Sequence, residues 1–218
     1  MTSTGRSRLG APDIKIGTTE RPVDGQALTY RRALLLEDRD DDLRAAAESA
    51  GLVKMGEPPE MVLRSPLDPL APPDEVELAS VADLPGVDRF VTTADLAYQT
   101  LGMQPGTFTE AVVDPDRFLD PWVHSVVALI DGVPLATAQV LLSHGIAGIY
   151  WVGTVAEARG KGLGEAVTRA VTERAFECGA GAVTLQASPQ GEPIYRRLGF
   201  ETLYRYQNWA RLAPVTAS

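Results

Sequence analysis

Apolar runs in the second half of the chain predict an antiparallel meander. Residues 123–130 and 133–143 are largely apolar, and the Asp-Gly pair between them is typical of a tight hairpin turn. A His-Gly turn then leads into residues 146–155. This last run is apolar on both alternations, which predicts a strand buried on both faces.

A helical period follows this meander. Apolar residues recur at helical spacing from Leu163 to Ala175, and Gly179 suits the end of that helix. Residues 182–188 return to a strand pattern, so the region predicts a strand, a crossover helix and a parallel strand. A short helix within "EPIYRRLGF" and a final strand over 201–212 complete the predicted order.

The first part of the chain predicts an extension ahead of this unit. Residues 1–26 are rich in Gly, Thr, Ser, Pro and charge, and we expect them to be flexible. Residues 27–65 predict a strand, a helix and a second strand, at 27–36, 40–51 and 60–65. One face of the predicted helix carries Leu43, Ala46, Ala47 and Ala50.

A proline-rich linker over residues 65–75 separates this extension from a domain predicted over 75–212. The domain begins with a strand pattern at 76–81, and Asp83 can cap the helix that follows. A further helical piece is predicted within 106–119. The inner stripe of the capped helix is Leu84, Val87, Phe90, Val91 and Ala94.

Composition narrows the classes of protein. Of 218 residues, 44% are apolar and 22% charged, which is typical of a folded protein and gives no sign of a membrane span. The net charge of -9 disfavours binding to nucleic acid and favours cationic partners. The chain has one cysteine, which excludes an intramolecular disulfide. Because it has only two histidines in addition, we expect no zinc cage and no other metal site. The N-terminus lacks a secretory signal, so we expect a cytoplasmic protein.

The stretch "EARGKGLGEAV", residues 157–167, places glycines at alternate positions between a strand and a helix, beside two cations. Such a loop favours an anion, because backbone amides and positive charge meet at the start of a helix. The GxxxxGK[ST] motif would need glycine at Val155 and Ser or Thr at Gly162, and GxGxxG would need glycine at Glu165. Neither motif fits, which leaves a diphosphate held by several amides.

The spacing Arg159-x-x-Gly162-x-Gly164, followed by "LQAS" and "IYRRLGF", resembles the acyl-CoA loop of the GNAT family of N-acetyltransferases. At the level of element order, the resemblance extends over about residues 75–212. It implies an α/β (α+β) fold: a mixed central sheet with an antiparallel meander, a splayed parallel strand pair and flanking helices. It also implies acetyl-CoA as co-substrate and a small-molecule or protein amine as acceptor, attacked directly in a ternary complex.

The resemblance also implies roles for individual residues. Main-chain groups of the strand before the loop pair with pantetheine, the loop amides hold the diphosphate, and a strand amide such as that of Val155 polarises the thioester. Tyr195 is the general acid for the leaving thiolate. Arg159 and Lys161 add charge or are solvated surface cations, and Ser188 contacts CoA or forms a turn. The implied donor-binding residues are Gly153, Thr154, Val155, Arg159, Gly160, Lys161, Gly162, Leu163, Gly164 and Ser188.

The sequence leaves the general base open. Candidates are Tyr150, a water chain, His124 and Glu110, because the central strand has no carboxylate at the position that many relatives use. Ala156 and Ala158 also depart from the family pattern and put the rigidity of the loop in doubt.

These gaps leave other functions open. A non-catalytic acyl-CoA sensor is the main alternative to an enzyme, and a plain nucleotide-binding protein is a further one. Residues 27–65 are interpreted as a degenerate half-domain, a lid or an oligomer contact. A homodimer is the default assembly.

Overall fold

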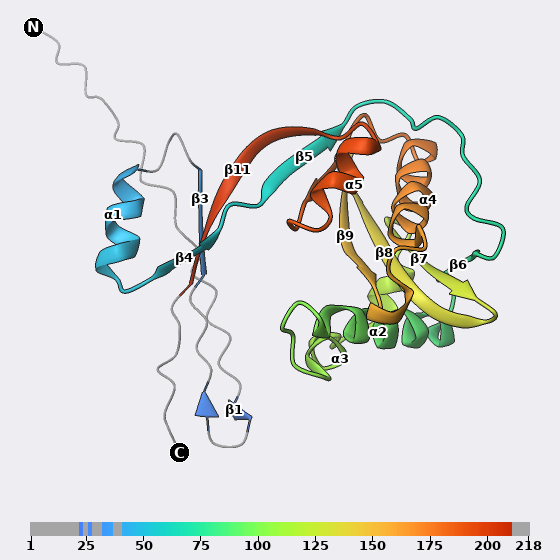
Figure 1. Ribbon diagram of the computed structural model, residues 1–218, viewed down its shortest axis with the longest axis horizontal. Coiled ribbons are helices and arrows are strands. Elements are labelled where there is room, and N and C mark those ends of the chain that lie inside the picture. The colour runs from blue at the N-terminus through green and yellow to red at the C-terminus, as the bar shows by residue number, and fades with distance from the viewer. Residues whose placement is uncertain (1–21, 24–25, 28–31, 37–40, 211–218) are drawn as a thin grey trace, which may run out of the picture. The chain divides into compact units, whose positions relative to one another are not determined.

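The computed structural model describes residues 22–23, 26–27, 32–36 and 41–210 (Figure 1). The chain divides into two units, Met1–Glu57 with Arg205–Ser218, and Pro58–Tyr204. Two short strands, β1 (Pro22–Val23) and β2 (Gln26–Ala27), pair antiparallel. The rest of the segment expected to be flexible lies outside the described residues, as do residues 28–31 of the first predicted strand.

The second unit is built on a mixed sheet in the order β11, β5, β10, β9, β8, β7, β6. Strands β7 to β9 form the predicted antiparallel meander, and β9 and β10 are parallel, so this part of the prediction is confirmed. The separately predicted strand β6 pairs antiparallel with β7. The strands are β5 (Pro59–Leu63), β6 (Glu77–Ser80), β7 (Val123–Ile130), β8 (Val133–Ser143), β9 (Ile146–Thr154), β10 (Val183–Gln186) and β11 (Glu201–Ala210).

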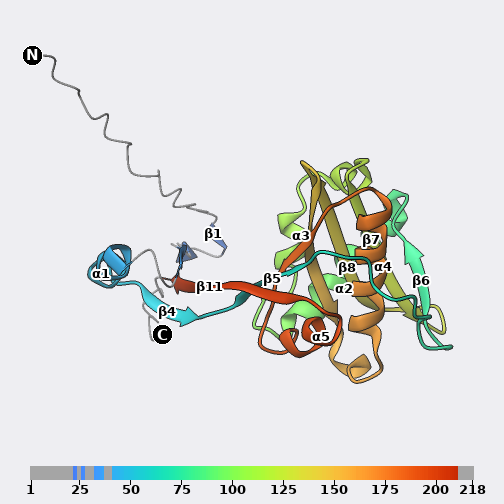
Figure 2. The same ribbon diagram turned by 90° about the horizontal axis from the view of Figure 1, so that it is seen from above.

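Helices cover both faces of this sheet. Figures 1 and 2 show α4 (Leu163–Glu177) and α2 (Leu84–Gln99) on opposite sides of β7, β8 and β9. The side chains of β7 alternate between the two faces: Val126 and Ala128 lie in the core under α4, whereas Val127 and Leu129 lie in the core under α2. The helix α5 (Glu192–Arg197) packs on the α4 side through Tyr195.

The predicted cap of α2 is confirmed, since the Gly86 N–H donates to Asp83 Oδ1 at 2.7 Å. The predicted stripe is wrong at Leu84, which is exposed because the helix meets the sheet only from Val87 onward. The helix also runs beyond Ala94 to Gln99. Two short helices, α3 (Thr107–Ala111) and η1 (Pro115–Leu119), account for the helical piece predicted after it.

Strand β9 is not buried on both faces, and that prediction is wrong. Ala147 and Ile149 are buried under α4, but Ile146 is 52% and Tyr150 50% exposed. The cause is the placement of α2, which contacts β9 late in the strand, at Gly153. The face of β9 opposite α4 is therefore open around Tyr150.

The first unit contains β3 (Arg32–Leu36), α1 (Asp41–Ser49) and β4 (Val53–Gly56). The end of β11 pairs antiparallel with both β3 and β4. Strand β4 was not predicted, because its four residues, VKMG, are too few to show a period. The predicted inner face of α1 is wrong at Ala46 and Ala50, which are exposed; Ala47 is buried against Trp209.

The chain between β5 and β6 contains no helix or strand, as the proline-rich linker predicts. None of the helices in the described ranges combines the length and the apolar character that crossing a bilayer requires.

Candidate active site

The parallel pair β9 and β10 separates within the sheet. Pairing runs from Ala147 with Val183 to Ile149 with Leu185 and then stops. Strand β9 nevertheless continues to Thr154, still paired with β8 on its other edge. The edge of β9 that faces β10 therefore leaves the ladder after Ile149, and this is the splayed strand pair that the family resemblance implies.

A β-bulge lies on β9 where the strands separate. Thr137 pairs with Gly153 and Gln139 with Tyr150, so two residues of β9 stand opposite one residue of β8. Trp151 has φ +53°, an unusual conformation for a bulky side chain, and its carbonyl accepts a hydrogen bond from Thr137 Oγ1 at 2.9 Å. The bulge turns Trp151 to the same side of the sheet as Tyr150.

Backbone groups of β9 divide between its two edges. The Val155 N–H donates to the Leu135 carbonyl of β8 at 2.9 Å, so it is not free to polarise a thioester as predicted. Because a strand alternates, Val152 and Thr154 direct their N–H groups to the opposite edge, toward β10. Their carbonyls are bonded outside the ladder, to Tyr98 and Arg159. Val152, which the sequence analysis missed, therefore presents an amide on the open edge.

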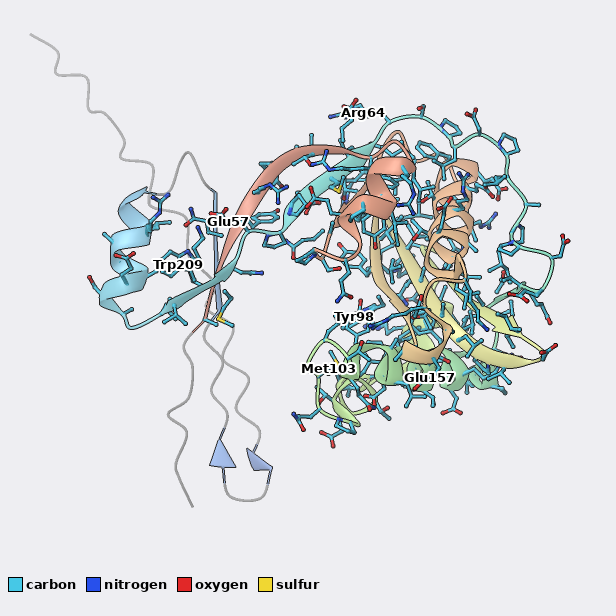
Figure 3. All side chains as sticks on the ribbon, in the orientation of Figure 1. Glu57, Arg64, Tyr98, Met103, Glu157 and Trp209 are labelled. Atoms are coloured by element: carbon cyan, nitrogen blue, oxygen red, sulfur yellow. The ribbon has the colours of Figure 1, made fainter. Side chains whose placement is uncertain are left out.

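Tyr98, at the end of α2, is a second residue that the sequence analysis missed (Figure 3). Its hydroxyl donates to the Val152 carbonyl at 3.3 Å, and its ring lies edge-on to Trp151 with centroids 5.4 Å apart. A Cβ at Gly153 would lie 3.1 Å from Tyr98 Cε2 and 2.9 Å from Ala97 Cβ. The glycine is thus needed for the close approach of α2. Continuing the helical spacing beyond Ala94 would have found Tyr98.

Tyr195 is buried on α5, with its ring edge-on to Phe200 and packed over Gly191. Burial raises the pKa of Tyr195, and nearby Tyr98 raises it further. Burial also raises the pKa of Tyr98, to about 12. Both phenols are therefore protonated at neutral pH. No hydrogen bond of the Tyr195 hydroxyl is found within the described part of the chain, so its proton is available to a ligand.

The glycine loop joins β9 to α4 through a short turn, η2 (Ala156–Ala158). Gly160 and Gly162 have φ of +78° and +79°, in the left-handed region that favours glycine. The first N–H groups of a helix have no intrahelical acceptor, and among the described residues none accepts from the amides of Gly160 to Gly164. Leu163 is buried beneath the loop. The loop therefore presents a group of free amides, as an anion requires.

The cations of the loop differ in their contacts. Arg159 is exposed, and its guanidinium donates to the Thr154 carbonyl and to the Thr100 hydroxyl at the end of α2. Lys161 is exposed and forms no ion pair with the residues that the structure describes. Arg159 thus ties the loop to β9 and α2, and Lys161 is the cation left free for a ligand. Ala158, one of the two alanines that depart from the family pattern, is buried and anchors the turn before the loop.

Ser188 forms the turn before α5. Its Oγ accepts the Gly191 N–H at 3.1 Å, and its carbonyl accepts the Gly191 and Glu192 N–H groups. The turn role is therefore present. The hydroxyl still has a proton to donate, so a contact to CoA stays a prediction.

The candidate bases are scattered. The Tyr150 side chain folds back over Gly148, where a Cβ would lie 2.8 Å from its hydroxyl. His124 Nε2 lies 3.5 Å from Cys178 Sγ, beyond the far end of α4, which is about 22 Å long at 1.5 Å per residue. Glu110 is exposed on α3. His124 is thus remote from the loop, and burial together with Arg174 lowers its pKa.

Asp95, a buried carboxylate on α2, is also not a free base. It accepts hydrogen bonds from the backbone of Gly106 and Phe108, at 2.9 and 3.0 Å, and from the side chain of Gln99. Burial alone would raise the pKa of Asp95, but these hydrogen bonds outweigh burial and hold the pKa below its usual value. The carboxylate fixes the loop between α2 and α3. Within the described ranges, no group of three or more acidic, His or Cys residues is placed to hold a metal ion.

Comparisons with known proteins agree with this geometry. The Acetyltransferase (GNAT) family matches residues 93–200. A structure described as a GCN5-related N-acetyltransferase from Kribbella flavida is 26% identical, with a TM-score of 0.65, and the match covers 85% of this chain and 69% of that one. A GCN5-related N-acetyltransferase from Sphaerobacter thermophilus shares the fold at 20% identity and a TM-score of 0.62, over 83% and 59% of the two chains.

No curated protein sequence gives a significant match. The family match nevertheless includes the bulged strand, the glycine loop and Tyr195, which are the parts that form the site. The chain belongs to the GNAT family of acetyltransferases, enzymes that transfer an acyl group from acyl-CoA.

Proposed function

We propose that the protein transfers an acetyl group from acetyl-CoA to an amine, by direct attack of the amine in a ternary complex. The observation that carries this proposal is the continuity of the splayed edge of β9 with the free amides of the glycine loop. That surface suits an extended ligand with an anionic end, because the backbone groups of the strand can pair with amide groups of the ligand and the loop amides can bind its phosphates. A neighbour of the same fold from Clostridium acetobutylicum is described as containing acetyl-CoA.

Each part of the donor then has a protein partner. The diphosphate is bound by the amides of Gly160 to Gly164 with Lys161, and the pantetheine by the open edge of β9. The Val152 N–H replaces Val155 as the donor that stabilises the developing oxyanion. The Tyr195 hydroxyl gives its proton to the departing thiolate. No covalent enzyme intermediate is required.

The test is CoA release with a panel of amines: spermidine, kanamycin, free L-lysine and a lysine-containing peptide. Thiol release that depends on one of these amines, with an acetylated product of the expected mass, supports the proposal. The Tyr195→Phe variant removes only the hydroxyl, and Tyr204→Phe is its matched control because Tyr204 is exposed on β11. Turnover that survives Tyr195→Phe unchanged would contradict the assigned role.

A second candidate is a non-catalytic acyl-CoA sensor. The observation in its favour is the lack of a carboxylate on β9 from Tyr150 to Thr154. It predicts saturable acetyl-CoA binding without thiol release for every amine of the panel. Amine-dependent thiol release that Tyr195→Phe abolishes would exclude it.

We also propose that the first unit is a degenerate half-domain. It repeats the order β10, α5, β11 as β3, α1, β4, and both helices end at a glycine of positive φ, Gly51 and Gly199. The hydrogen bonds at the two ends match: Gly51 and Leu52 donate to Glu48 and Ala47, as Gly199 and Phe200 donate to Arg196 and Tyr195.

Ala47 therefore stands where the second unit has Tyr195, so the first unit lacks the acid. A structure described as a tandem GNAT protein from the clavulanic acid pathway shares the fold at 15% identity and a TM-score of 0.58. The proposal predicts no acetyl-CoA site in the first unit. A calorimetric stoichiometry of two per chain would contradict it.

A further inference from the structure

The side of the sheet opposite α4 carries a polar surface beside the splayed strands. We call it the open shelf and define it by Tyr150 of β9, Thr184 and Gln186 of β10, and Glu60 of β5. Thr184 pairs with Gly148, over which the Tyr150 ring lies, and Gln186 pairs with Glu60. Gln186 is the last residue of β10, so Glu60 lies level with the point where β9 and β10 separate.

Alternation fixes the side to which Glu60 projects. Met61 and Leu63 of β5 belong to the core under α4, and so do their partners Leu185 and Val183. Glu60 and Thr184 are the alternate residues and face the other way. Tyr150 faces the same side, since its neighbour Ile149 is in the α4 core. The four shelf residues therefore share one face.

Glu60 is a half-buried carboxylate with an incomplete set of partners. Its side chain is hydrogen-bonded to Thr184, and it forms no ion pair with any residue that the structure describes. Burial raises the pKa of Glu60, and the bond from Thr184 only partly offsets this. A carboxylate in this condition gains from a nearby cation, and a raised pKa brings a general base closer to working pH.

We propose that Glu60 binds the ammonium group of the acceptor and takes its proton, as the base that β9 lacks. This inference rests on the proposed acetyl transfer. The three ammonium protons are then accounted for. One N–H bond breaks and its proton passes to a Glu60 oxygen and on to solvent. The neutral nitrogen bonds to the thioester carbon while the C–S bond breaks.

The Tyr195 proton goes to sulfur in this step. The second nitrogen proton is released after attack and restores the Tyr195 hydroxyl, and the third stays on the amide nitrogen. The base is thereby supplied by β5, a strand that precedes the glycine loop by about a hundred residues along the chain and joins the sheet next to β10.

The experiment compares two nucleophiles in the full chain. The first is the amine of the panel with the highest turnover, and the second is hydroxylamine, which is largely unprotonated at neutral pH and needs no prior deprotonation. Glu60→Gln should lower kcat/KM for the ammonium substrate by about 100-fold or more, the usual contribution of a general base. The hydroxylamine rate and the acetyl-CoA dissociation constant should remain near wild type.

Two variants serve as controls. Glu60→Asp keeps a carboxylate and should recover part of the lost rate. Glu77→Gln changes an exposed glutamate on β6, at the other edge of the sheet, and should have no effect. Equal losses with both nucleophiles, or no loss in Glu60→Gln, would overturn the role of Glu60 while acetyl transfer stands. Absence of CoA release by the wild type with every amine would overturn both proposals.

Discussion

The glycine loop offers a matched pair of substitutions, Gly160→Asp and Gly179→Asp. Both glycines have positive φ, +78° and +85°, and a Cβ at either position would meet nothing within 4 Å. Gly160 lies in the loop before α4, and Gly179 lies just after the other end of that helix. An aspartate at either site should therefore cost stability only through its backbone conformation, about 1–2 kcal/mol.

The two variants should differ in acetyl-CoA binding, because only the aspartate at position 160 places its negative charge beside the diphosphate. At a distance of about 4 Å, two unit charges repel by about 1 kcal/mol in water and about 4 kcal/mol near a protein surface. Since 1.4 kcal/mol corresponds to a factor of ten, Gly160→Asp should weaken acetyl-CoA binding by about 5- to 700-fold. Gly179→Asp should leave binding unchanged, because Gly179 follows the opposite end of α4.

The assay is calorimetric titration with acetyl-CoA, together with thermal unfolding of both variants. Similar melting temperatures with a loss of affinity confined to Gly160→Asp would support the loop as the diphosphate site. Wild-type affinity in both variants would contradict this prediction, and so would an equal loss of affinity in both, because the loop would then have no special contact with the donor.

Tyr195→Phe should lower kcat by about 100-fold or more without changing the acetyl-CoA dissociation constant, because only the proton donor is lost; stopped-flow thiol detection and calorimetry measure the two quantities. Asp95→Ala should lower the free energy of unfolding by about 2–4 kcal/mol, since the buried N–H groups of Gly106 and Phe108 lose their acceptor. Urea unfolding measures this loss, and an unchanged midpoint would contradict it. The raised pKa of Tyr98 contributes stability that is complete below about pH 10 and is lost as pH rises toward about 12; Tyr98→Phe should flatten this part of the stability profile, and an unaltered profile would count against it.

Local patterns predicted much of the fold. The Asp-Gly turn and the switch from strand to helical spacing gave the meander, the crossover helix and the parallel strand, because each depends on neighbours along the chain. The loop glycines were recognisable for the same reason. Strand β4 and the insertion of β5 beside β10 were not, since they depend on pairing between distant segments.

The chemistry at the splayed strands was less predictable. The bulge at Trp151 decides which amides face the open edge, and it follows from the pairing of β8 with β9 rather than from any residue of β9 alone. The family resemblance therefore pointed to the N–H of Val155, which is bonded to Leu135, and not to that of Val152. Tyr98 could have been predicted, because it continues the helical stripe that the prediction ended at Ala94. The place of Glu60 beside the splayed strands could not be predicted, because it depends on the order of strands in the sheet.

Calorimetric titration of the full chain with acetyl-CoA is the most direct test of the proposed donor site. We predict saturable binding with a stoichiometry of one, because the described residues contain one glycine loop with free amides. We also predict that CoA competes with acetyl-CoA and that ATP and NAD do not. The absence of binding to folded protein would contradict it.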